Sequence, residues 1–195
     1  GIMQSQKVGP AIADDITQAA FVAVICALIG IFLYILLRFR NFAYSVGAVC
    51  ALTHDAIIVL GAYALLWKVM PFSMEIDQSF IAAILTVIGY SINDTVVIFD
   101  RVREYNHLYP KRERHININD AINNTLSRTF STSMSTFVVL LAIFCFGGES
   151  IRGFVFALLI GVIVGTYSSM CIAPSIAHSI QMAQDRKREK KALNK

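Results

Sequence analysis

The sequence predicts an all-α integral membrane protein, a five-helix transmembrane bundle, from its composition and its apolar spans. Of its 195 residues, 56% are hydrophobic and only 15% are charged, and the mean hydropathy is +0.61. A soluble domain normally carries about a quarter charged residues. Five apolar stretches, at about 17–37, 42–67, 80–99, 125–146 and 153–173, are long enough to cross a bilayer as helices.

Polar segments delimit these spans. Residues 1–16, with the breaker Gly9 and Pro10, are expected to be the end of an outward-facing domain or a linker. The motif RFRN at 38–41 predicts a tight turn between the first two spans, and a short connection containing Pro71 precedes the third. We take residues 17–176 as the transmembrane domain.

The longest internal polar segment, residues 100–124, lies between the third and fourth spans, and a short interfacial helix is predicted from Asn119 to Leu126. The fifth span is expected to stop near Pro174, because proline removes a backbone donor from a helix. A basic cytoplasmic tail, 177–195, follows it. Because the chain begins at GIMQSQKVGP, it is also expected to be a fragment of a longer protein.

Basic residues fall mostly on one side of the predicted bundle. The opposite side carries three, Lys7, Lys68 and Arg152, whereas the richer side carries thirteen, in the RFRN turn, the 100–124 segment and the tail. Cytoplasmic loops hold the excess of lysine and arginine, so the N-terminus of this chain is expected outside and the C-terminus in the cytoplasm. The net charge of +4 therefore reports topology and contact with the anionic lipid bilayer, and no nucleic acid partner is predicted.

The cysteines indicate neither a metal site nor a disulfide framework. All of them lie within apolar spans, at wide separations and without a CxxC pair, which predicts small buried hydrophobic residues. These are Cys26, Cys50, Cys145 and Cys171. No catalytic set, metal site or cofactor is predicted.

Asp94 is the leading candidate functional residue, because an aspartate inside a membrane helix costs about 2.5–3.5 kcal/mol and needs a reason. Arg128 lies near the start of the fourth span, at a similar depth if the two helices are neighbours. Burial favours a protonated carboxyl, whereas a nearby guanidinium favours the carboxylate. A changing distance between Asp94 and Arg128 would therefore switch proton affinity, although a static pair that locks two helices is the alternative.

A stripe of hydroxyls is predicted beside Arg128 on one face of the fourth helix, where it would line a hydrated path or bond only to its own backbone or to a neighbouring helix. Its members recur at three- and four-residue spacing: Thr125, Thr129, Thr132, Ser135 and Thr136.

Further polar residues are secondary candidates for a proton relay or for helix packing. His54 and Asp55 lie near the middle of the second span, an expensive position for both. Asn93 and Thr132 belong to the same secondary set. In the fifth span, Gly161 and Gly165 form a GxxxG motif, a weak signal of close helix packing.

Four segments together resemble the SecF family: ALTHDAIIVLG at 51–61, GYSINDTVVIFDRVRE at 89–104, TLSRTFSTSMST at 125–136 and FGGESIRGFVFALLIGVIVGTYSS at 146–169. The resemblance covers nearly the whole chain, in order, as in SecF or the C-terminal SecF half of a fused SecDF. From this resemblance, the chain is expected to lack the first SecF helix and most of the outward-facing domain.

The resemblance implies half of a resistance-nodulation-division type membrane domain in the bacterial plasma (inner) membrane. It implies a non-enzymatic accessory subunit of the Sec machinery that uses the proton-motive force, with no other cofactor, to promote late stages of preprotein translocation. The implied partners are SecD, the SecYEG channel, YajC, YidC and the translocating preprotein. The family's proton-pathway aspartate and arginine correspond to Asp94 and Arg128.

Three other functions compete with this interpretation. A proton-driven small-molecule efflux subunit of the same superfamily would need large outward domains with a substrate pocket. An intramembrane aspartyl protease could use Asp55 and Asp94 as a dyad, but Asp94 lies in SIND and lacks the Gly-x-Gly-Asp context. A purely structural scaffold would use neither carboxylate chemically.

Overall fold

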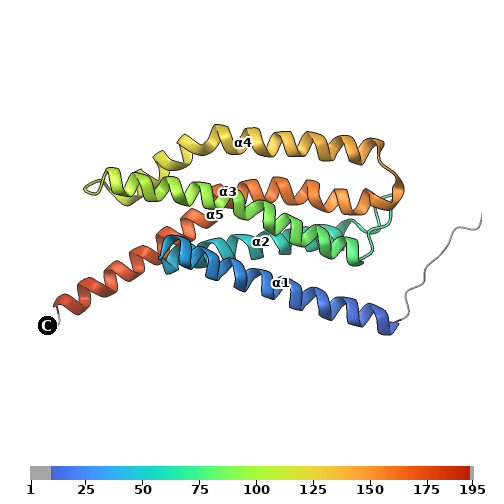
Figure 1. Ribbon diagram of the computed structural model, residues 1–195, viewed down its shortest axis with the longest axis horizontal. Coiled ribbons are helices and arrows are strands. Elements are labelled where there is room, and N and C mark those ends of the chain that lie inside the picture. Colours follow the sequence, from blue (N-terminus) through green and yellow to red (C-terminus); the bar gives the residue numbers. More distant parts are fainter. Residues whose placement is uncertain (1–9, 194–195) are drawn as a thin grey trace, which may run out of the picture.

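The structure is a computed structural model that describes residues 10–193, all of whose secondary-structure elements are helices (Figure 1). Their bounds are α1 Pro10–Phe39, α2 Phe42–Leu66, α3 Gln78–Leu108, α4 Arg114–Phe146 and α5 Glu149–Leu193. All five are long and apolar enough to cross a membrane. The predicted fold class is therefore confirmed. Residues 1–9 and 194–195, which include the predicted breaker Gly9 and the topogenic Lys7, lie outside the described residues.

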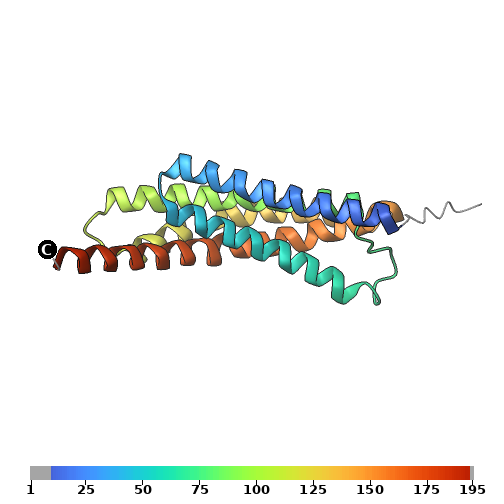
Figure 2. The same ribbon diagram turned by 90° about the horizontal axis from the view of Figure 1, so that it is seen from below.

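The helices alternate in direction, so the connections gather at two opposite ends (Figures 1 and 2). The α1–α2 turn, the α3–α4 connection and the end of α5 share one end, hereafter the basic end. The α2–α3 connection and the start of α5 lie at the other. Helix α5 contacts α2, α3 and α4, whereas α1 and α4 lie on opposite edges of the bundle (Figure 1). The predicted grouping of the basic segments is thus met by the fold.

Local chemistry explains where α2 and α3 begin. Asn41 caps α2, its side chain accepting a hydrogen bond from the backbone N–H of Ala43 at 3.0 Å. Asp77 caps α3 in the same way, accepting from the N–H of Phe80 at 2.9 Å. Both caps satisfy amide groups that a helix start leaves free. Arg40 has a φ of 50°, the left-handed conformation that reverses the chain within the RFRN turn.

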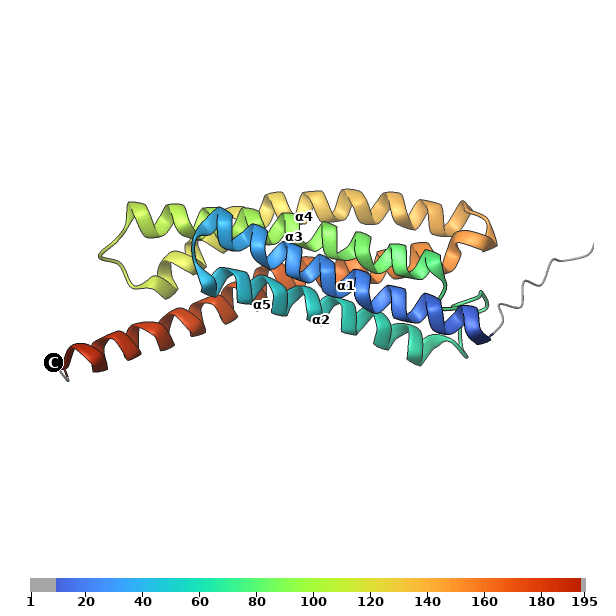
Figure 3. The ribbon, with the colours of Figure 1, turned by 60° about the horizontal axis from the view of Figure 1, so that its bottom comes forward.

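The segment between the third and fourth spans is more helical than predicted. Helix α3 continues to Leu108 and α4 begins at Arg114, so only 109–113 connect them (Figure 3). The separate interfacial helix predicted from Asn119 to Leu126 is wrong, because those residues belong to α4 without a break. The polar side chains there indicated an end to the membrane span, but polar residues also extend a helix into water.

Helix α5 does not stop at Pro174, contrary to the prediction, and continues to Leu193. A proline inside a helix removes one backbone hydrogen bond and bends the helix rather than necessarily ending it. The course of α5 changes direction between its start and its basic end (Figure 1). The predicted basic tail is therefore the last part of a 45-residue helix.

Two apolar clusters form the core. The first lies toward the end where α2 meets α3 and contains Leu52, Val59, Phe80, Val87 and Leu158. The second lies toward the basic end and contains Ile35, Tyr44, Ile98, Phe99 and Ala173. Polar residues of α2, α3 and α5 lie between the two clusters. We call them the polar layer: His54, Asp55, Ser91, Asp94 and Ser168.

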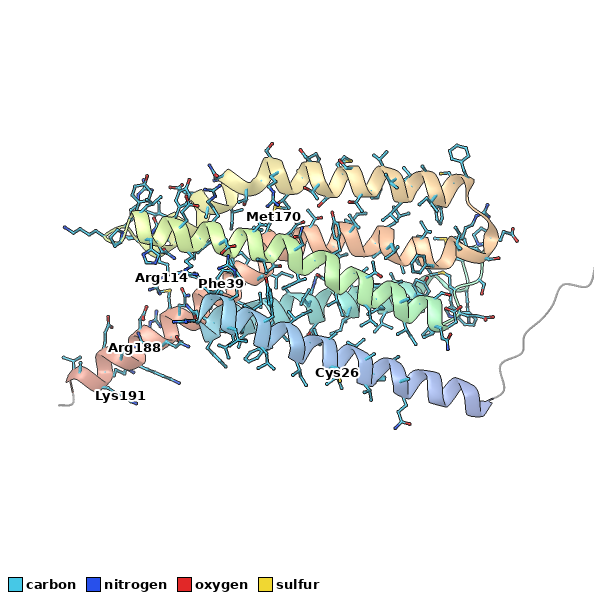
Figure 4. The ribbon with its side chains drawn as sticks, viewed as in Figure 1. Cys26, Phe39, Arg114, Met170, Arg188 and Lys191 are labelled. Atoms are coloured by element: carbon cyan, nitrogen blue, oxygen red, sulfur yellow. The ribbon has the colours of Figure 1, made fainter. Side chains whose placement is uncertain are left out.

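The cysteines do not belong to this core. All four are exposed, and Cys26 points away from the bundle in Figure 4. The prediction that they are buried is wrong, because an apolar span fits both the inside of a bundle and its lipid-facing surface.

Candidate functional site

Asp55 forms the centre of the polar layer. Its side chain is completely buried on α2. Its Oδ2 accepts hydrogen bonds from Ser91 Oγ of α3 and Ser168 Oγ of α5, each at 2.7 Å. Its Oδ1 lies 3.2 Å from Nδ1 of the neighbouring His54, whose side chain is 35% exposed. One carboxylate therefore joins three helices and reaches the bundle surface through an imidazole.

Small residues allow these serines to reach Asp55. A Cβ on Gly165 would lie 3.0 Å from Ser91 Cβ, and one on Gly161 would lie 2.0 Å from Val87 Cγ2. The GxxxG motif thus brings α5 against α3, as the sequence predicted. This close approach lets serines from two different helices donate to the same oxygen.

Asp94 lies on the same helix as Ser91, three residues later, and is 3% exposed. Residues three apart occupy neighbouring positions on one helix face. In contrast to Asp55, the Oδ2 atom of Asp94 is buried and has no hydrogen-bond partner among residues 10–193. A buried carboxyl oxygen without a partner is rare, and it usually marks strain or function.

Arg128 lies on α4, which packs against α3, and its side chain is exposed. Within the described chain no ion pair of 4.0 Å or less joins it to Asp94. The fold therefore brings the two residues to neighbouring helices without direct contact. The gating pair remains a prediction.

The hydroxyl stripe predicted on α4 does not form one polar face. Thr125 and Thr129 are buried, whereas Thr132 and Ser135 are exposed and Thr136 is half-buried. The last three donate to carbonyls of their own helix. These bonds are Thr132 to Arg128 at 2.9 Å, Ser135 to Ser131 at 2.7 Å and Thr136 to Thr132 at 3.1 Å. The buried residues of α4 end at Ser133, so a common spacing does not give a common environment.

A second hydroxyl cluster, which the sequence did not indicate, joins α3, α4 and α5. Thr166 Oγ1 donates to Ser133 Oγ at 2.6 Å, and the Tyr90 hydroxyl approaches the same oxygen at 3.4 Å. Ser91 and Ser168 were also missed as partners of Asp55. A usable signal existed, because Ser91 precedes Asp94 by three residues and Ser168 follows Gly165 by three.

The remaining secondary candidates are divided by the fold. His54 and Asp55 belong to the polar layer, whereas Asn93 and Thr132 are exposed and lie away from it. Asp55 and Asp94 share no hydrogen bond within residues 10–193, and Oδ2 of Asp55 already accepts hydrogen bonds from two serines. This arrangement does not resemble a pair of carboxylates that share one proton.

Known proteins resemble this chain over nearly its whole length. Residues 1–183 match the family described as "Protein export membrane protein SecD/SecF, C-terminal". A protein translocase subunit SecF from Rhodothermus marinus is 49% identical over 175 residues, which are 90% of this chain and 56% of the relative. A protein translocase subunit SecDF from Brucella abortus is 45% identical over 166 residues, 85% of this chain and 21% of the relative.

Solved structures support the same relationship. The structure titled "Crystal structure of SecDF in Super-membrane-facing form" superposes with a TM-score of 0.81 at 35% identity, covering 94% of this chain and 24% of that one. A SecDF described as a translocon-associated membrane protein, from Thermus thermophilus, gives 0.78 at 39% identity, covering 89% and 23%. The chain spans about half the length of the curated SecF relatives that it matches. On its sequence and its membrane fold, the chain belongs to the SecD/SecF family of protein export membrane proteins.

Proposed function

We propose that this chain is the membrane part of an export subunit that uses the proton-motive force to promote late stages of preprotein translocation. Membership of the SecD/SecF family supports protein export as the process. The coupling to protons rests on the polar layer. Within it, Asp94 accepts and releases the proton, and Arg128 alters the proton affinity of Asp94 as α4 moves relative to α3.

The observation that carries this proposal is the buried Oδ2 atom of Asp94, which has no partner among the described residues. A carboxyl that is held by several donors is fixed in one ionisation state, whereas one without donors responds to small changes around it. Moving one charge across the membrane releases about 2.3 kcal/mol per 100 mV, enough to bias a conformational equilibrium of a few kcal/mol.

Asp55 has a different role in this mechanism. Its bonds to Ser91 and Ser168 fix α3 against α2 and α5, close to the start of the turn that carries Asp94. We assign it as a positioning residue that holds the helix of Asp94 still while α4 moves. His54, which links Asp55 to the bundle surface, is the secondary relay candidate on this side.

Membership of the family also supports a proposal for the partners. SecD, as a separate subunit or as the other half of a fused chain, would complete the membrane domain, in line with the relatives named SecDF. The SecYEG channel, YajC, YidC and the moving preprotein are the further partners that we propose. The protein would be multi-pass in the bacterial inner membrane, with the basic end of the bundle in the cytoplasm and the proton gradient in place of a cofactor.

The test is preprotein translocation into inverted vesicles that contain the complete complex, with and without an imposed proton gradient. Asp94→Asn and Arg128→Met are expected to abolish the gradient-dependent component and to retain ATP-driven entry. Asp100→Asn is a matched control, because Asp100 is on the same helix but is 40% exposed and pairs with Arg38 at 3.0 Å. Gradient-dependent translocation at the wild-type rate by Asp94→Asn, at matched expression, would refute the proposal.

A further inference from the structure

A cavity of about 710 Å³ opens at the basic end of the bundle, away from the polar layer. All five helices or their connections contribute to its wall, so residues distant in sequence meet there. Phe39 of α1 and Arg114 of α4 lie close together at this end in Figure 4. The volume is within the range of pockets that bind small molecules.

The wall of this cavity is rich in positive charge. Three arginines line it together with His107, His115 and His178, against the two carboxylates of Glu113 and Asp185. Two of the arginines are already paired, Arg112 with Asp120 and Arg114 with Asp185, both at 2.8 Å. Arg103 is the third, and no ion pair within 4.0 Å engages it among residues 10–193.

Arg103 of α3 and Arg114 of α4 line the same cavity as Tyr44 of α2. Helix α4 also begins here, and its N-cap residue Glu113 makes no side-chain capping bond. The amide groups at a helix start carry partial positive charge and favour anions.

Asn117, which also lines the cavity, has a buried oxygen without a hydrogen-bond donor among the described residues. Asn117 is 1% exposed, and its Nδ2 donates to Asn106 Oδ1 at 3.1 Å and to the Tyr109 carbonyl at 3.2 Å. These bonds fix the amide, yet its Oδ1 is buried without a hydrogen-bond partner among the described residues. A ligand that carries a hydroxyl or an ammonium beside its phosphate would supply the missing donor.

The position of the cavity favours a lipid over a free anion. Its wall starts at Phe39 and Tyr44, where α1 ends and α2 begins, and reaches the α3–α4 connection. It therefore lies just beyond the apolar spans, at the depth of lipid headgroups. Aromatic residues are typical of this depth, and basic pockets between membrane helices bind phospholipid headgroups.

We infer that this cavity binds the phosphate of an anionic glycerophospholipid headgroup. Arg103 and Arg114 bind the phosphate oxygens, and a small shift of the cavity wall lets the enclosed Asn117 Oδ1 accept a hydrogen bond from the donor group of the headgroup. The basic last turns of α5, with Arg188 and Lys191 beyond the bundle in Figure 4, add long-range attraction to the same anionic surface. This site is separate from the proton-coupling residues and does not depend on their role.

The test measures lipid binding to the complete membrane protein in neutral detergent by native mass spectrometry, with phosphatidylglycerol and phosphatidylcholine as the two probes. Phosphatidylglycerol is expected to bind more tightly. Arg103→Gln is expected to weaken it by about tenfold, the loss of one charge-assisted contact. Arg101→Gln removes the same charge two residues earlier on α3, where Arg101 pairs with Glu104 at 2.7 Å outside the cavity, and should leave the affinity unchanged.

Competition separates the two sources of phosphate. If a headgroup fills the cavity, millimolar inorganic phosphate or glycerol phosphate leaves phosphatidylglycerol bound. Complete displacement by inorganic phosphate would overturn the lipid assignment and indicate a free anion. Equal losses in Arg103→Gln and Arg101→Gln, or none in Arg103→Gln, would show that only the overall surface charge matters and would overturn the site. Arg103 is exposed and outside any described ion pair, so its replacement should not disturb folding.

Discussion

Asp55 and Asp94 are two carboxylates buried in the same bundle with opposite surroundings. Asp55 is fully buried and has hydrogen-bonding neighbours on both oxygens. Asp94 is 3% exposed, and its Oδ2 has no partner among residues 10–193. The sequence presents them as similar, since each interrupts an apolar span.

These different surroundings suit different roles for the two carboxylates in the proposed mechanism. A buried charge that is saturated with donors stabilises one arrangement of helices, and removing it leaves those donors unpaired. A buried carboxyl that lacks donors contributes little to stability but can change its protonation when a neighbour moves. In the proposed mechanism Asp55 therefore fixes the helices against one another, and Asp94 is the carboxyl whose protonation changes.

The largest expected effect breaks this comparison directly. Asp55→Leu leaves the hydroxyls of Ser91 and Ser168 without their acceptor, and we expect a loss of about 3 kcal/mol in the free energy of unfolding. Asp94→Leu removes a carboxyl whose Oδ2 has no described partner, so its stability should match or exceed that of the wild type. Unfolding by SDS titration of the full-length protein measures both. Similar losses in the two variants would contradict the assigned roles.

The second prediction concerns the close packing of α5 against α3, which brings the serines to Asp55. Gly161→Ala places a Cβ 2.0 Å from the stiff, β-branched Val87, and the overpacking should cost about 2 kcal/mol. Gly89→Ala is the matched control, because a Cβ at Gly89 has nothing within 4 Å. The control should be unchanged or slightly more stable in the same titration. An unchanged Gly161→Ala would mean that α5 can retreat from α3 freely.

The third prediction concerns one of the two serine donors to Asp55. Ser168→Ala removes one interhelical hydrogen bond to Asp55 and should cost about 1 kcal/mol, within the range measured for such bonds in membranes. Ser175→Ala removes a hydroxyl of α5 that bonds only its own helix, to the Cys171 carbonyl at 2.6 Å, and should cost less. In an Asp55→Leu background the Ser168→Ala cost should vanish. Full additivity of the two changes would argue against the bond.

The smallest change in the free energy of unfolding is expected for a polar contact outside the polar layer. Arg38 and Asp100 pair at 3.0 Å between α1 and α3, with both side chains at least 40% exposed. Arg38→Gln should change the free energy of unfolding by about 0.5 kcal/mol or less, and less still at high salt. Thermal unfolding at two salt concentrations measures this. A loss as large as that of Asp55→Leu would remove the contrast between the layer and the surface.

Much of the fold could be predicted because hydropathy is a local property of the chain. Bilayer thickness fixes the length of a span. The predicted span ends therefore agree within a few residues with the helix ends at the α1–α2 turn and at the end of α4. The sequence did not predict the helix extensions beyond the spans, because polar residues at 100–108 and 114–124 are equally compatible with a loop and with a solvated helix. The path of α5 through Pro174 depended on its packing against α2 and α3, which no local signal reveals.

The sequence alone marks Asp55, Asp94 and Arg128 as residues that need a reason, because an ionisable residue in an apolar span is costly wherever the helix faces. Which carboxylate has hydrogen-bond donors depends on the tertiary structure. The donors to Asp55 come from 36 and 113 residues away, and they meet it because α5 approaches α3 at its glycines. The rotation of each helix about its axis sets such partnerships. In a membrane, lipid and protein interior are both apolar, so hydropathy does not report that rotation.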